Sequence, residues 1–173
     1  MSRYLLVLQE RLRSGKDIDI PWRRVNKELD FYRRKVKFKV PKVAKSLIYH
    51  YYSSPTPSAL SYIPWGPKRD ILKEHLPTPL VVGKGTLLDI YALFYLDLLD
   101  PNFQEKSLHN TALHVAVTTN NLRALEILLR YGAQNLPNKN GITPLDWAKL
   151  LGREEAYHIL AHHFKTLNEE IKT

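Results

Sequence analysis

The sequence predicts a mainly α-helical protein, in which a short stack of paired helices follows an extended, basic N-terminal arm. Three observations support this prediction. Two similar seven-residue segments recur 32 residues apart, and helical hydrophobic spacing follows each of them. Residues 1–85 carry an excess of 11 positive charges, whereas residues 86–173 have a net charge of −2. Seven of the 11 prolines fall between Pro41 and Pro79, where they favour extended chain.

The repeated segments are Asn110–Ala116 and Ile142–Ala148. In the first copy, leucines at positions 122, 125 and 129 follow the i, i+3, i+7 spacing of one helix face. Gly132 then suits a left-handed helix C-cap. In the second copy, Pro144 suits a first helical turn, which does not need its N–H group. Each copy therefore predicts two short helices separated by a break, at Asn120-Asn121 and at Gly152-Arg153.

This pattern resembles the ankyrin repeat. The family sequence Thr-Pro-Leu-His-x-Ala, followed by Leu-Leu-x-x-Gly-Ala, has counterparts in Thr111–Ala116 and Leu128–Ala133, and Asn138–Leu145 matches the start of the next repeat. The resemblance covers residues 106–164 and implies a short solenoid of helix-turn-helix pairs joined by hairpin loops. It also implies that His114 makes a structural hydrogen bond between neighbouring repeats. Asn120 departs from the usual Gly, and Asp146 replaces the usual His.

The resemblance also implies a binding surface, because ankyrin modules bind partners through hairpin tips and the exposed face of each first helix. Carried over by position, the implied protein-binding residues are Ser107, Leu108, Asn110, Thr118, Thr119, Lys139, Asn140, Ile142, Leu150 and Leu151. Four of these are apolar, and exposed apolar groups tend to be covered by a partner. We expect Trp147 to be packed rather than free.

Two repeats are too few to bury a continuous core. The apolar residues of Thr86–Leu99 almost encircle a helix, so this helix must be buried on most sides. We interpret residues 86–105 as a capping helix or a degenerate repeat. The predicted organisation is therefore a basic arm at 1–85, this segment at 86–105, ankyrin repeats at 106–164 and a polar tail at 165–173.

No family resemblance is recognised in the basic arm (residues 1–85). Its pattern predicts short helices at Arg3–Arg13, Val25–Arg34 and Lys42–Tyr52, and an extended strand at Val36–Val40. We expect the proline- and aromatic-rich stretch from Pro41 to Pro79 to be mostly extended and to lie against a partner.

A cluster of cations in the arm predicts contact with an anionic surface. The candidate residues are Arg23, Arg24, Arg33, Arg34, Lys35, Lys37, Lys39, Lys42 and Lys45. Aromatic residues are interleaved with them, which would suit phosphate contact combined with base stacking. An acidic protein face, an anionic lipid surface or plain solvation explains the same charges, because charge alone does not distinguish anions.

Several classes of chemistry lack support in the sequence. The chain has no cysteine, which excludes disulfides and thiolate ligands. No catalytic set, cofactor-binding motif or small-molecule substrate site is indicated, and Gly83–Thr86 lacks the spacing of a phosphate loop. Glu154, His158 and His162 share a helix face, which we expect to be solvated rather than metal-binding. The longest apolar run is too short and too charged to span a bilayer, so we expect no transmembrane segment.

We therefore expect a non-catalytic structural or accessory subunit of a large multiprotein assembly, without cofactors, whose partners are other protein subunits. Two alternatives stay open: an RNA-contacting protein of an organellar ribosome or other ribonucleoprotein, and a free adaptor or effector that recruits one soluble partner. The Arg-rich, amphipathic start favours a mitochondrial location over the cytoplasm, although Glu10 argues against a targeting segment.

Overall fold

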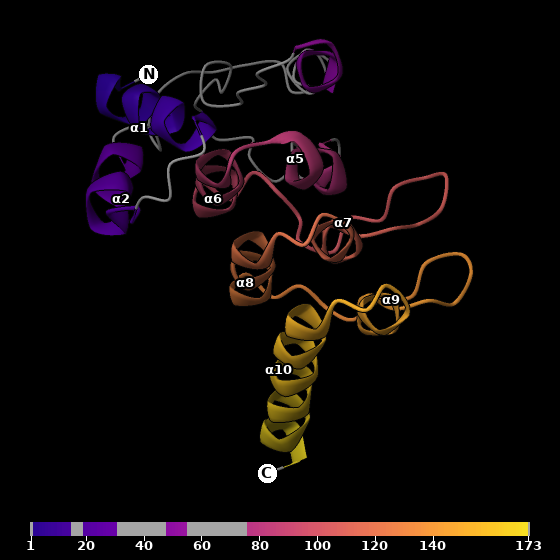
Figure 1. The fold of residues 1–173 in the computed structure, drawn as a ribbon. Helices are drawn as coiled ribbons and strands as arrows, with labels where there is room; N and C mark the ends of the chain where they lie inside the picture. Colours follow the sequence, from indigo (N-terminus) through magenta and orange to yellow (C-terminus); the bar gives the residue numbers. More distant parts are fainter. Residues whose placement is uncertain (1, 15–18, 31–47, 55–75, 173) are drawn as a thin grey trace. The chain divides into compact units, whose positions relative to one another are not determined.

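A computed structural model of the 173-residue chain describes residues 2–14, 19–30, 48–54 and 76–172. The chain forms two compact units, Met1–Asp100 (unit 1) and Pro101–Thr173 (unit 2). Every regular element of the described residues is a helix, which confirms the mainly α-helical prediction. Figure 1 shows these helices along the chain.

Unit 1 contains α1 (Arg3–Arg13), α2 (Trp22–Asp30), α5 (Thr78–Lys84) and α6 (Leu87–Tyr95), and residues 48–53 are also helical. The helix predicted at Arg3–Arg13 is confirmed. The second predicted helix begins earlier than expected, at Trp22, and its last predicted residues, 31–34, lie outside the described residues. The strand predicted at Val36–Val40 and the first half of the helix predicted at Lys42–Tyr52 lie there too.

Helix α6 is the centre of unit 1, because α1, α2 and α5 all pack against it. Leu88, Ile90 and Leu93 of α6 are fully buried, as the nearly all-round apolar pattern predicts. The helix ends at Tyr95 rather than continuing to Leu99. It ends there because Asp97 adopts a left-handed conformation with φ of 62°, and the Leu98 N–H closes back on the Leu93 carbonyl at 2.8 Å.

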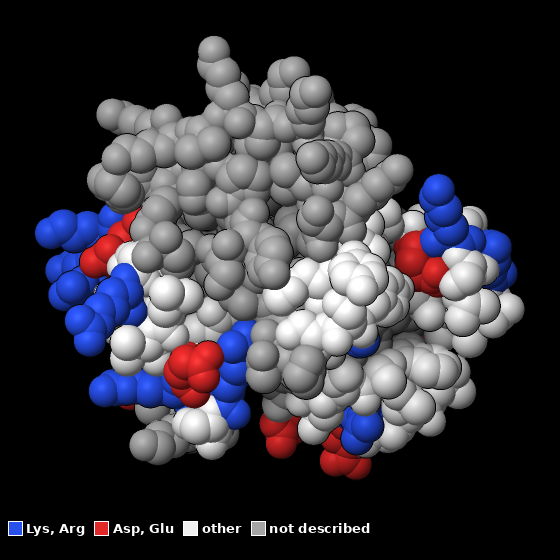
Figure 2. Space-filling model, turned by 90° about the horizontal axis from the view of Figure 1, so that it is seen from above, with Lys and Arg blue, Asp and Glu red and all other residues white. Residues whose placement is uncertain are grey.

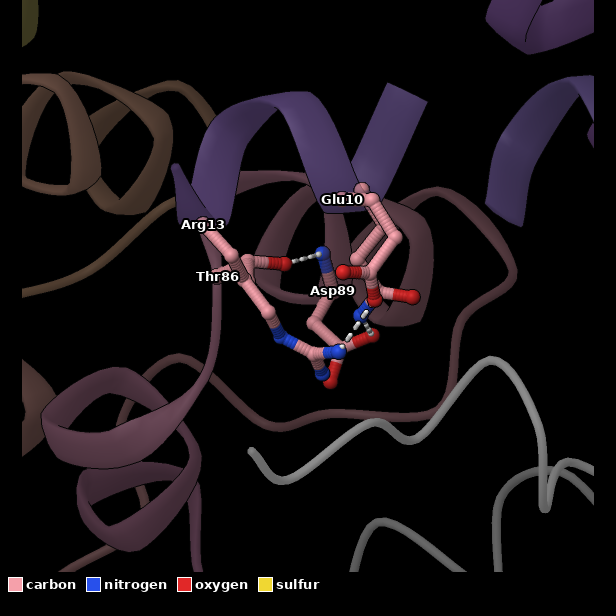
Figure 3. A network of polar contacts seen from close by, with 5 residues as sticks. Glu10, Arg13, Thr86 and Asp89 are labelled. Atoms are coloured by element: carbon pink, nitrogen blue, oxygen red, sulfur yellow. Dashed lines mark hydrogen bonds and ion pairs between the residues drawn. The ribbon is translucent and has the colours of Figure 1, made fainter. Parts of the chain in front are cut away.

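A polar contact lies inside this apolar core, on the side of α6 that meets α1. Asp89 is fully buried, and its carboxylate accepts hydrogen bonds from Gln9 Nε2 at 3.1 Å and from the Tyr51 hydroxyl at 2.6 Å. Thr86 caps the helix by accepting from the Asp89 N–H (Figure 3). A carboxylate in an apolar core needs such donors, so Asp89 ties α1 and residues 48–53 to α6.

Helix α5 is a difference from the sequence-based expectation of extended chain up to Pro79. It begins at Thr78 and holds Pro79 in its first turn, where the missing N–H costs nothing. The buried Thr78 hydroxyl donates to the Asp100 carbonyl at 2.6 Å. The segment Thr78-Pro79-Leu80 repeats Thr143-Pro144-Leu145, a signal that the sequence analysis missed.

Unit 2 consists of two helix pairs, α7 (Ala112–Thr118) with α8 (Leu122–Arg130) and α9 (Pro144–Leu150) with α10 (Glu154–Lys172). The turn within each pair contains one left-handed residue, Asn120 with φ of 53° and Gly152 with φ of 69°. Asn tolerates this conformation better than other non-glycine residues, which explains how Asn120 replaces the usual Gly. Helix α10 continues through the predicted tail to Lys172.

Candidate protein-interaction surface

In unit 2, one loop precedes the first helix of each pair. Figure 1 shows that the two loops extend to the same side. We call residues 101–111 and 133–143 the first and second hairpin loops. The first is closed by the Glu105 N–H donating to the Asn110 carbonyl at 3.1 Å. The second is closed by the Asn138 N–H donating to the Ile142 carbonyl at 2.9 Å. Each loop is thus closed by a backbone hydrogen bond near its tip, and the second closure is one residue shorter than the first.

Glu105 fixes the tip of the first hairpin loop. One carboxylate oxygen accepts from the N–H groups of Leu108 at 2.6 Å and Asn110 at 3.2 Å. The other accepts from the N–H group of Ser107 at 2.8 Å and from its hydroxyl. Partial burial acts to raise the pKa of Glu105, but these hydrogen bonds outweigh it and lower the pKa from 4.5 to about 2. The tip is therefore held by an ionised carboxylate.

Asn138 has the corresponding role in the second hairpin loop. Its side-chain oxygen accepts from the N–H groups of Asn140 at 3.0 Å and Ile142 at 3.1 Å. Its amide nitrogen reaches across to the side-chain oxygen of Asn110 at 3.1 Å. Asn138 thereby both shapes its own loop and connects it to the first.

Further hydrogen bonds join the two loops at their tips. The Lys139 N–H donates to the Leu108 carbonyl at 2.9 Å, and Lys139 Nζ donates to the Lys106 carbonyl at 3.2 Å. Gln104 Nε2 bridges the loops by donating to the carbonyls of His109 at 3.1 Å and Pro137 at 3.0 Å. The hairpin loops therefore form one connected edge of unit 2.

His114 connects the bases of the same two loops. Its Nδ1 accepts from the Thr111 N–H at 3.0 Å, so the ring proton resides on Nε2, which donates to the Ile142 carbonyl at 2.8 Å. Burial lowers the pKa of His114, an effect that the bond to Ile142 partly opposes. The structural hydrogen bond between neighbouring repeats that the resemblance implied is present.

A second contact joins Thr118, the last residue of α7, to Trp147 in the middle of α9. The Trp147 indole N–H donates to the Thr118 hydroxyl at 2.8 Å, and this hydroxyl donates in turn to the His114 carbonyl at 2.9 Å. Arg153 Nη2 donates to the Thr118 carbonyl at 3.1 Å. Trp147 is half-buried, in keeping with its expected packing, and Thr118 serves as a link between the two helix pairs.

The ten residues expected to bind protein all lie on this edge or at the C-terminal ends of α7 and α9. Asn110 and Ile142 are half-buried, and the other eight are exposed. Leucine side chains are the largest apolar groups among them, with exposed fractions of 52% for Leu108, 66% for Leu150 and 40% for Leu151. The loops and helix ends thus present apolar groups on a backbone that hydrogen bonds hold in place.

Of the nine cations expected to bind an anionic surface, the structure describes Arg23 and Arg24, both exposed on α2. The other seven lie outside the described residues: Arg33, Arg34, Lys35, Lys37, Lys39, Lys42 and Lys45. Glu154, His158 and His162 are exposed on α10. Among the described side chains, no group of three or more His, Asp or Glu residues is arranged to hold a metal ion.

Sequence reasoning missed the residues that shape the loops, namely Gln104, Glu105 and Asn138. All three act through hydrogen bonds to loop backbone, and such bonds leave no periodic signal in the sequence. A polar side chain two to five residues before a turn is a weak indication that could have suggested Glu105 and Asn138.

These features define a class of helix-pair repeat protein in which hairpin loops project from successive pairs. Residues 82–171, just over half of the chain, match the family model described as ankyrin repeats (3 copies). The chain therefore belongs to the ankyrin-repeat family, whose modules typically mediate protein–protein interaction. The matched range includes all of α6. No curated protein matches the sequence.

Proposed function

We propose that this chain is a non-catalytic accessory subunit of a larger protein assembly, and that it binds a protein partner through unit 2. The observation that supports this proposal is the exposure of Leu108, Leu150 and Leu151 on the surface of the hairpin loops and helix ends. Exposed leucines on a fixed backbone favour protein contact, because burying them releases water while little conformational entropy is lost.

Site-specific photo-crosslinking tests this proposal in cells that normally express the protein. A benzophenone amino acid replaces Leu108 or Leu150 in separate variants, and the matched control places it at Glu126, which is exposed on the second helix of its pair. We expect positions 108 and 150 to crosslink to the same partner protein and position 126 to give no such product. Crosslinking of position 126 alone would contradict the proposed surface.

Substitution of the exposed leucines tests whether they contribute to the affinity for the partner. Leu150→Gln combined with Leu151→Gln removes apolar contact area without touching the core, so the melting temperature should stay within a degree or two of the wild-type value. The yield of the crosslink from position 108 should fall at least tenfold. Unchanged crosslinking would show that these two leucines do not face the partner.

The size of the native complex distinguishes an accessory subunit from a free adaptor. We expect the endogenous protein to sediment with a large assembly at physiological salt. Sedimentation as a monomer or as a one-to-one complex would favour the adaptor. Loss of the large particle after ribonuclease treatment would favour the ribonucleoprotein alternative.

We also propose a mitochondrial location, which the Arg-bearing amphipathic helix α1 supports. Subcellular fractionation of the same cells tests this location.

A further inference from the structure

The outward face of α1 combines aliphatic and cationic side chains. Arg3, Leu6, Val7 and Arg11 follow the i, i+3, i+4, i+8 spacing of one helix face, and all four are exposed. The exposed fractions are 38% for Leu6 and 47% for Val7. The opposite face holds Leu5 and Leu8 in the core of unit 1, so packing against α6 fixes which side chains α1 presents to solvent.

Helix α2 extends this cationic face. Arg23, Arg24 and Lys27 are exposed on it, and the Arg24 guanidinium lies 4.5 Å from the centre of the Tyr4 ring of α1. This cation–π contact brings the two helices together at the surface. Figure 2 shows Lys and Arg side chains gathered at the left, the side on which Figure 1 places α1 and α2. We call the exposed residues of these two helices the α1–α2 face.

Most acidic groups of the α1–α2 face are already engaged. Glu10 pairs with Arg13 at 2.9 Å, Glu28 pairs with Arg24 at 3.3 Å, and Asp30 accepts from the Tyr95 hydroxyl at 2.8 Å. Asp19 is the remaining exposed acid among the described residues of these two helices and their flanks. No described carboxylate lies within ion-pair distance of Arg3, Arg11, Arg23 or Lys27. The face therefore offers a surplus of positive charge to a partner.

The side chains between the cations indicate the class of anion. Sequence-tolerant binding of single-stranded RNA uses free aromatic rings on which bases stack. On the α1–α2 face, Trp22 packs against Tyr91 at 4.1 Å between ring centres, and Tyr4 lies under Arg24. Leu6 and Val7 offer no stacking surface. Aliphatic side chains flanked by arginines suit instead the boundary between lipid headgroups and acyl chains.

We propose that the α1–α2 face binds an anionic membrane surface, with arginines on lipid phosphates and with Leu6 and Val7 at the edge of the acyl chains. No helix among the described residues is long and apolar enough to cross a membrane, and this contact requires none. Unit 2 would remain available for protein, so the chain would link a partner to a lipid surface. This inference goes beyond the proposed function and does not depend on it.

Vesicle co-sedimentation of the full chain tests this inference. The probes are vesicles of phosphatidylcholine with phosphatidylserine and vesicles of phosphatidylcholine alone. We expect binding to the anionic vesicles that weakens as salt increases, and little binding to the neutral ones. Arg3→Gln with Arg11→Gln should weaken anionic binding at least tenfold, because each cation near such a surface contributes about a fivefold gain in affinity.

A second variant tests the aliphatic contribution, and a third serves as control. Leu6→Gln with Val7→Gln should also weaken binding several-fold, whereas Arg123→Gln with Arg130→Gln, exposed on α8, should leave it unchanged. Circular dichroism and melting curves establish that each variant is folded. Equal binding to both vesicle types, or no binding, overturns the proposal, as does an unchanged affinity of the Leu6 and Val7 variant.

A parallel titration with single-stranded polyuridylic acid distinguishes RNA from lipid. RNA binding that the Arg3 and Arg11 substitutions abolish, without vesicle binding, overturns the lipid assignment in favour of RNA. Crosslinking at Leu108 and Leu150 tests only the surface of unit 2, whereas vesicle binding tests the α1–α2 face. Either proposal can therefore fail without affecting the result for the other.

Discussion

The Tyr91 hydroxyl on α6 donates a 2.5 Å hydrogen bond to the side-chain oxygen of Asn26 on α2. One turn further along both helices, the Tyr95 hydroxyl donates to Asp30 at 2.8 Å. The two tyrosine rings stack on each other with centres 5.8 Å apart. Since both pairs advance by four residues in the same order, α2 and α6 run side by side in the same direction. This register joins an arm helix to a helix of the repeat region.

We expect Tyr91→Phe to lower the free energy of unfolding by about 1 kcal/mol, because the Asn26 oxygen loses its donor in a partly buried site. Tyr95→Phe should cost less, since that pair is exposed and solvent replaces the bond. Urea unfolding of the full chain measures both. A double-mutant cycle of Tyr91→Phe with Asn26→Ala should give a coupling energy of roughly 0.5–1 kcal/mol. Zero coupling would contradict the observed pairing.

His114→Phe should destabilise unit 2 by about 2 kcal/mol, because the Thr111 N–H and the Ile142 carbonyl both lose their partner while the core volume is retained. Thermal unfolding measures this loss. His158→Phe, at an exposed position of α10, is the matched control and should change stability little.

The same histidine predicts a pH dependence of stability. Its pKa is lowered in the folded state from the ordinary value of 6.5, so the unfolded chain binds the proton more strongly. The contribution of neutral His114 to the free energy of unfolding is therefore complete above pH 6.5, and it declines as the pH falls below that value. The His114→Phe variant should lack this part of the profile. An identical pH profile in both proteins would show that another group titrates.

Glu105→Gln should loosen the first hairpin loop, because an amide group cannot accept the four hydrogen bonds that the carboxylate accepts. We expect amide hydrogen exchange of Ser107, Leu108 and Asn110 to accelerate about tenfold, which corresponds to roughly 1–2 kcal/mol of local stability. Exchange in α10 should stay unchanged and serves as the internal control.

Acid titration provides an independent check on Glu105. Because its folded pKa is lowered from 4.5 to about 2, its contribution is complete above about pH 4.5 and is lost as the pH falls toward 2. Nuclear magnetic resonance of the Glu105 side-chain carboxyl group should report its midpoint near 2. A midpoint near 4.5 would mean that the loop hydrogen bonds do not form in solution.

Gly152→Ala should cost about 1 kcal/mol through backbone strain alone. Gly152 adopts a φ of 69°, and nothing lies within 4 Å of the position that an added Cβ would occupy. Asn120→Ala, at the equivalent turn with a φ of 53°, should cost less, because Asn already carries a side chain in that conformation. Calorimetric melting of both variants measures the two losses, and a larger loss for Asn120→Ala would contradict this account.

Local sequence signals predicted the repeats of unit 2, because each helix boundary has a cap or break of its own, such as Pro144 and Gly152. They did not predict that α1 and α2 pack on α6. That packing brings together distant parts of the chain, with Leu5 of α1 and Val25 of α2 fully buried. The sequence patterns of α1 and α2 predict an apolar face on each helix but do not indicate which helix that face packs against. The exposure of Leu108, Leu150 and Leu151 could be predicted from their positions in the ankyrin repeat. The sequence offered only a weak local indication of Glu105 and Asn138, whose bonds lie mainly within their own loops, and no indication of the bonds from Gln104 to Pro137 and from Asn138 to Asn110, which form only when both loops are in place.

The backbone link from the Lys139 N–H to the Leu108 carbonyl has a consequence for the kinetics of partner binding. Because the two loop tips are tied to each other before any partner arrives, encounter does not have to wait for a loop to find its bound shape. Association would then be limited by diffusion and orientation of the two proteins, and variants of the exposed leucines would act mainly on the lifetime of the complex. If unit 2 binds a protein as proposed, this surface would select its partner by shape at first contact.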